Sequence, residues 1–248
     1  MTASILSNAW RIYRDRFGLI AAVVLIVWVP CELLNSYLDA FVFGPDAFLR
    51  SFKTSQILDN FLGIIATAGV TRIALSARQG EPVAFAQAMG TGFAAWPRLW
   101  WTRILAGLAV VVAFLCLIVP GIYYATRLYF VETIAVVEGI SGVDALKRSL
   151  ALTENRFWQT FGFGVLLTLL ILIPIAAVVV PLLFIPALEH WLINAGTGLV
   201  GDFAAAFSTV ALLCGYEMYA RLLDESDDAE QAVPNKMPLT AGNADLRG

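Results

Sequence analysis

A set of ionisable side chains stands inside or at the ends of long apolar runs, where charge is unusual. These residues are Glu32, Asp59, Arg72, Arg127, Glu132, Asp202 and Glu217. A charge at the centre of a lipid bilayer costs about 2.5 to 3.5 kcal/mol, so such residues normally face the interior of a helix bundle and find partners there. Three uses fit this pattern: ion pairs between helices, a polar path for a solute or an ion, and snorkelling toward the interface.

Arg127 is the charge whose partner can be argued furthest. Glu132 follows it by five residues, which is about 140° around a helix, so the two side chains do not share a face. Counting from the start of its predicted span, Arg127 lies about 9 Å deep in the outer half of the membrane. Asp59, Asp202 and Glu32 fall in the same layer. The sequence therefore predicts an ion pair of Arg127 with Asp59, with Asp202 and Glu32 as alternatives.

Two further acids, Glu132 and Glu217, fall nearer the cytoplasmic half of their predicted spans. Arg72 and Arg221 lie at similar depths in the membrane, so they are the candidate basic partners of these two acids. The same depth argument thus predicts a second polar layer closer to the cytoplasmic surface.

Residue patterns of catalysis are weak in this chain. The single histidine, His190, has no partner at metal-ligand spacing, and the three cysteines are scattered through apolar runs. Glycines at 90, 92, 162 and 164 lack the residues of a phosphate-binding loop. We therefore expect no catalytic residues, no metal, no cofactor and no enzymatic activity.

The elements that position these charges follow from composition. Of 248 residues, 59% are apolar and only 14% are charged, and the mean hydropathy is +0.77. A soluble domain of this length cannot bury so much apolar surface, because its own surface must be covered largely by polar groups. The chain is predicted to be an all-α integral membrane protein. With 16 basic against 19 acidic residues it is not expected to bind nucleic acid.

A helix needs about 20 apolar residues to cross the hydrocarbon layer. Clear candidates are residues 18–37, 100–119, 157–180 and 199–220, and weaker ones are 57–77 and 121–138. With these six spans, 13 of the 16 lysines and arginines fall on one side and only Arg50 and Lys53 on the other, Arg127 being the sixteenth. The positive-inside rule then places both termini in the cytoplasm of a bacterial cell, with the chain multi-pass in the inner membrane.

The predicted domains are a six-span membrane domain over residues 1–223 and a disordered acidic cytoplasmic tail over 224–248. The tail carries six acidic residues against two basic ones, and it also contains Pro234 and Pro238. Such a composition buries too little apolar surface to fold by itself.

Similar amphipathic segments precede the first, third and fifth spans, at residues 4–16, 85–96 and 143–157. Each leads to a basic residue followed by a bulky apolar one, and the bases are Arg16, Arg98 and Arg156. We expect three repeats of one interfacial helix plus two spans. In each repeat the arginine would contact lipid phosphates, so membrane lipids are predicted partners.

The segment from Pro120 to Trp158 contains a distinctive series of short motifs: Pro120-Gly121-Ile122-Tyr123, Arg127-Leu128-Tyr129-Phe130, Val137-Glu138-Gly139, Ala145-Leu146-Lys147-Arg148-Ser149 and Arg156-Phe157-Trp158. This series resembles bacterial inner-membrane proteins of the glycerophosphoryl diester phosphodiesterase membrane-domain family and related six-span families. The resemblance implies a fold and a location. It does not imply hydrolysis, because the soluble phosphodiesterase barrel has paired histidines, and this chain has one histidine and no room for a barrel.

Together these features favour a non-enzymatic accessory, scaffold or regulatory membrane domain, in envelope or lipid homeostasis by family analogy. A protein partner in the membrane would fit that role. The alternative is a small transporter or permease for a lipid-related or small polar solute. A cavity lined by Arg127, Glu132 and Asp59 would favour transport, whereas a solid bundle would favour the accessory role.

The orientation can be tested with single cysteines and a membrane-impermeant thiol reagent. Because basic residues mark the cytoplasmic side, reagent added outside should label cysteines near Phe48 and Asn194 but not near Ser7, Gln87 or Asp228. Labelling of the tail from outside would contradict this topology.

Overall fold

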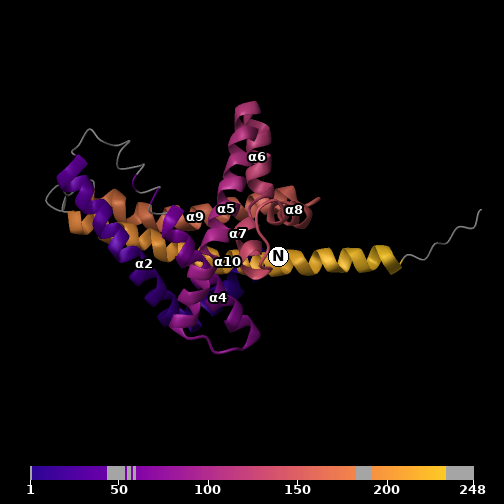
Figure 1. Ribbon diagram of the computed structural model, residues 1–248, viewed down its shortest axis with the longest axis horizontal. Helices are drawn as coiled ribbons and strands as arrows, with labels where there is room; N and C mark the ends of the chain where they lie inside the picture. The colour runs from indigo at the N-terminus through magenta and orange to yellow at the C-terminus, as the bar shows by residue number, and fades with distance from the viewer. Residues whose placement is uncertain (1, 44–53, 55–56, 58–59, 183–190, 233–248) are drawn as a thin grey trace, which may run out of the picture.

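The computed structural model describes residues 2–43, 54, 57, 60–182 and 191–232, and every regular element in that part of the chain is a helix. This confirms the all-α class. The N-terminal half contains α1 (Thr2–Asp15), α2 (Phe17–Leu38), a π-helical turn η1 (Asp39–Phe43), α4 (Gly63–Gln79) and α5 (Phe85–Cys116). The C-terminal half contains α6 (Ile118–Arg127), α7 (Val131–Val137), α8 (Val143–Leu152), α9 (Phe157–Leu182) and α10 (Trp191–Ala232), and Figure 1 shows their arrangement.

Among the described residues, four helical segments are long and apolar enough to cross a membrane: Phe17–Val42, Phe85–Cys116, Phe157–Pro181 and Ile193–Glu225. They coincide with the four clear spans predicted from the sequence, and they identify a membrane protein. The weaker candidates are not among them, so six spans are not confirmed. Over residues 57–77 the described helix α4 has only 17 residues and begins at Gly63.

The predicted span 121–138 is broken into two helices. Helix α6 ends at Arg127, and α7 begins at Val131. The turn between them bends the chain so that the Phe130 ring is fully buried in the core, stacked on Phe163 and against Tyr219. Apolar runs show which residues avoid water, but they do not show where a helix breaks to bring an aromatic ring into the core.

Helix α4 forms the centre of the body, with α2, α5, α7 and α10 packed around it. Small residues allow the close contacts. A side chain at Gly92 of α5 would lie 2.7 Å from the main-chain oxygen of Ile65, and one at Gly63 would lie 2.8 Å from the Trp28 ring. Close backbone approach at small residues is the usual way in which helices associate in membranes.

Helices α9 and α10 pack along one another in opposite directions, with Phe163 against Gly215 and Ile175 against Gly201. Helix α2 also packs on α10. Helix α9 continues through Pro174 and Pro181, so Pro174 does not end the helix. In Figure 1, α2, α9 and the first part of α10 together form the lobe on the left.

The amphipathic segments form helices, and the apolar face of the first one, α1, is covered by protein. Ile5, Ala9, Ile12 and Tyr13 of α1 are buried, and the helix packs on α10, where Tyr13 and Trp10 contact Phe207. Burial raises the pKa of the Tyr13 hydroxyl. The second segment is continuous with α5 rather than a separate helix, and the threefold repeat is not confirmed.

Helix α10 continues to Ala232, past the boundary expected at residue 223. The rest of the predicted tail, 233–248, lies outside the described residues, as do Phe48, Asp59 and His190.

The contact between α4 and α5 can be tested at two glycines of α5. Gly92→Ala forces a Cβ against the Ile65 oxygen and should destabilise the protein by about 1 to 3 kcal/mol. Gly90→Ala is the matched control. A side chain at Gly90 meets nothing within 4 Å, so the change should be neutral or slightly stabilising. Thermal unfolding in detergent measures both variants, and equal melting temperatures would contradict the close contact.

Candidate functional site

The best-formed ion pair joins α5 to α7 at the base of the α5–α6 hairpin. Arg103 donates two hydrogen bonds to the two carboxylate oxygens of Glu132, each 2.7 Å long. Such bidentate pairs are strong and fix the relative orientation of the two groups. Depth in the sequence offered Arg72 or Arg221 as the base for Glu132, but Glu132 pairs with Arg103, which was not among the candidates.

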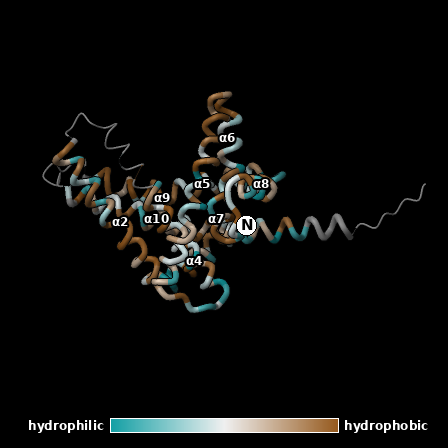
Figure 2. The backbone as a smooth tube through the Cα atoms, viewed as in Figure 1, coloured by the Kyte–Doolittle hydropathy of each residue, from teal (hydrophilic) through white to brown (hydrophobic). Residues whose placement is uncertain are grey.

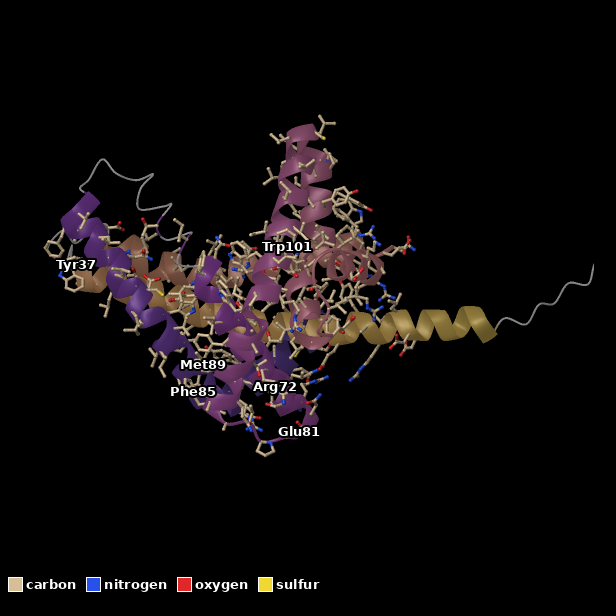
Figure 3. The ribbon with its side chains drawn as sticks, in the orientation of Figure 1. Tyr37, Arg72, Glu81, Phe85, Met89 and Trp101 are labelled. Atoms are coloured by element: carbon tan, nitrogen blue, oxygen red, sulfur yellow. The ribbon has the colours of Figure 1, made fainter. Side chains whose placement is uncertain are left out.

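A second pair joins α4 to α10. The Arg78 guanidinium lies 2.6 Å from a carboxylate oxygen of Glu217, and both side chains are mostly buried, with 24% and 19% exposed. Arg221 does not make this pair, although depth had suggested it. Arg72 makes no hydrogen bond or ion pair with any residue in the described part of the chain. Figure 3 shows Arg72 toward the Glu81 end of α4, well separated from Trp101 on α5.

A third polar group, missed from sequence, centres on Glu138 just after α7. Its carboxylate accepts a 3.0 Å hydrogen bond from Arg148 of α8 and a 2.7 Å bond from the Tyr216 hydroxyl of α10. The hydrogen bond to Glu138 raises the pKa of Arg148. No single apolar run contains the three residues, so only the folded chain brings them together.

Arg127 packs against α8 and the residue that follows it. Its guanidinium donates to the Thr153 hydroxyl at 3.0 Å, to the Tyr123 hydroxyl at 2.5 Å and to the main-chain oxygen of Leu150. It makes no ion pair with Glu32 or Asp202. The first-choice partner, Asp59, lies outside the described residues, so that pair stays a prediction.

Glu32 and Asp202 both lie in the left lobe, on α2 and α10. The Glu32 carboxylate presses directly on Gly198 of α10, leaving no room for a side chain there. Glu32 was predicted only as an alternative partner of Arg127, and its contact with α10 was not predicted from the sequence.

The three arginines expected to contact lipid phosphates each donate to a main-chain oxygen on another element. Arg16 donates to Glu81 at 3.4 Å, and Arg98 donates to Gly139 at 3.1 Å. Arg156 donates to Leu222 at 3.4 Å and lies over the Tyr219 ring. A guanidinium has five N–H groups, so donors remain for phosphate. The lipid contact stays a prediction.

An apolar groove of about 310 Å³ lies between α6 and α9. Its polar side chains are those of threonine and tyrosine, and the lining residues are Phe114, Ile122, Ala125, Thr126, Tyr129, Thr160, Phe161, Gly164, Val165, Thr168 and Leu169. A second hollow of about 310 Å³ includes Arg103 and Asn60. Neither contains both Arg127 and Glu132, the two described residues expected to line a transport cavity.

No group of histidine, cysteine, aspartate and glutamate that could hold a metal occurs among the described residues. Among them, the pairs Arg103–Glu132, Arg78–Glu217 and Arg148–Glu138 each join two elements.

Residues 61–219 match the family model described as Domain of unknown function (DUF7847), and because this is more than half of the chain, the protein belongs to that family. No curated protein and no solved structure matches the chain. The family found has no assigned function, and nothing in these comparisons names a glycerophosphoryl diester phosphodiesterase membrane domain, so that more specific resemblance is not confirmed.

The Arg103–Glu132 pair can be tested by a charge swap. Arg103→Glu and Glu132→Arg alone each leave two like charges facing one another and should each lower stability by about 1 to 3 kcal/mol. The double variant restores opposite charges and should recover part of the loss. Melting temperatures in detergent measure the effect. The exposed Arg14–Asp15 pair, 72% and 57% exposed, is the control and should respond little to the same swap. Additive effects at 103 and 132 would contradict the pairing.

Proposed function

We propose that this member of the DUF7847 family is a non-enzymatic membrane domain that serves as an accessory, scaffold or regulatory element in a bacterial inner membrane. Both termini lie in the cytoplasm, because 13 of the 16 basic residues fall on that side when the predicted spans are counted. Its partners are membrane lipids and another membrane protein, and its role is in envelope or lipid homeostasis.

The observation that carries this proposal is that charged side chains within the helical body pair with one another. Arg103 is paired with Glu132, Arg78 with Glu217, and Arg148 with Glu138. A catalytic or transport site needs polar groups that face a substrate, but these groups face one another. All of them lie within the matched range 61–219, so the pairs belong to the part of the chain that defines the family.

The alternative, transport of a small polar solute, is less well supported. The groove between α6 and α9 contains no charged side chain, which suits an acyl chain better than a polar molecule. The hollow that includes Asn60 also contains Arg103, but the Arg103 guanidinium is bonded to both oxygens of Glu132. A third hollow, of about 180 Å³, contains Arg78, which is paired with Glu217.

The experiment that tests the proposed role compares lipid composition and growth in a strain lacking the protein. We expect an altered lipid profile that the wild-type chain and His190→Ala both restore, because no catalytic histidine is needed. The purified protein should release no glycerol phosphate from glycerophosphodiesters, with or without divalent cations. Metal-dependent release that His190→Ala abolishes would contradict the proposal. Uptake of a polar solute by proteoliposomes would favour the transport alternative.

A further inference from the structure

The α5–α6 hairpin has a fully apolar tip. No charged residue occurs between Arg103 and Arg127, and the residues around the turn are apolar and exposed, with Leu115 at 81% and Val119 at 76%. Figure 2 shows the upper part of the hairpin coloured mainly as hydrophobic, standing clear of the rest of the body. Such a tip is unsuited to water on the far side of a membrane.

The base of the hairpin is held at the level of α8. Arg127, at the end of α6, bonds to Thr153 and to the Leu150 oxygen. Arg98 of α5 bonds to the Gly139 oxygen, just before α8 begins. Helix α8 carries Lys147 and Arg148 and lies on the cytoplasmic side in the orientation proposed above. The hairpin therefore leaves the body near the cytoplasmic surface.

The second arm is too short to cross. Helix α6 has 10 residues, about 15 Å at 1.5 Å per residue, whereas the hydrocarbon core is about 30 Å thick. Starting from Arg127 at the cytoplasmic level, the tip at Ile118 reaches about the middle of the bilayer. A crossing would instead require Arg127 to sit deep in hydrocarbon, away from α8.

The direction of the hairpin also argues against a crossing. In Figure 1, the axes of α5 and α6 run at a steep angle to those of α9 and α10. The two pairs of helices therefore cannot both be parallel to the membrane normal. Helices α9 and α10 are the longer pair, with 26 and 42 residues. If they cross the membrane, the hairpin lies inclined, and its depth is less than its length.

We propose that the α5–α6 hairpin inserts into the cytoplasmic leaflet and ends there, with the acyl chains of that leaflet packed around its tip. This inference rests on the proposed orientation. The hairpin returns to the side from which it started, so the positive-inside distribution of all other segments is unchanged. The groove between α6 and α9 then opens to the same acyl chains. A hairpin inserted in this way increases the area of the cytoplasmic leaflet and not that of the outer leaflet.

A native residue reports the depth of the tip. Cys116 is exposed, whereas Cys31 and Cys214 are buried. In a Cys31→Ser/Cys214→Ser chain, a fluorophore on Cys116 should be quenched more by nitroxides along the lipid chains than by nitroxides on head groups. An impermeant thiol reagent should label Cys116 neither in right-side-out nor in inside-out vesicles. Labelling in right-side-out vesicles would overturn the proposal. If the double variant fails to fold, comparing the wild type with Cys116→Ser gives the same readout.

A second single cysteine separates this inference from the orientation on which it rests. Asp144 is exposed on α8, and Asp144→Cys in a cysteine-free chain should be labelled only in inside-out vesicles. Labelling from outside would overturn the proposed orientation and with it the cytoplasmic leaflet. If Asp144→Cys is labelled only in inside-out vesicles but Cys116 is labelled in right-side-out vesicles, the orientation holds and only the hairpin proposal is overturned.

Discussion

Arginine side chains bond to main-chain oxygens at or just beyond the ends of helices, and these bonds connect elements that are far apart in the sequence. The last carbonyl groups of a helix have no partner within the helix, so a donor from another element can bond to the chain there. Arg98 bonds to the oxygen of Gly139 after α7, Arg127 to that of Leu150 in the last turn of α8, and Arg16 to that of Glu81 after α4. Leu150 lies in the last turn of α8, and Gly139 and Glu81 lie two residues past the ends of α7 and α4, so each bond joins the end of one helix to another element.

The same constraint explains how the remaining charges are used. Once Arg103 is bonded to Glu132 and Arg78 to Glu217, the interior is held by groups that have little freedom to serve a substrate. Two of the surfaces left for contact with other molecules are apolar: the exposed hairpin tip and the groove between α6 and α9. The surface of this protein is therefore built to meet lipid, which is the basis of the accessory role proposed for it.

Hydropathy and length were sufficient to predict the helical class and the four long apolar helices, because these properties depend on local composition. They could not predict the break after Arg127, which exists so that Phe130 can pack between Phe163 and Tyr219, residues far along the chain. Depth along ideal helices identified Glu132 and Glu217 as paired acids but missed Arg103 and Arg78, since depth does not show which faces of two helices meet. The Glu138, Arg148 and Tyr216 group shows the same limit.

The central claim is that the interior charges are structural, and replacing one ion pair with apolar side chains tests it most directly. The Arg103 and Glu132 side chains are 26% and 37% exposed, and an ion pair withdrawn from water can often be exchanged for hydrophobic residues of similar size without loss of stability. We predict that Arg103→Met/Glu132→Leu accumulates in the membrane and restores the lipid profile of a strain lacking the protein. Normal accumulation with no restoration would contradict the account, because it would show that these charges act on something other than the fold.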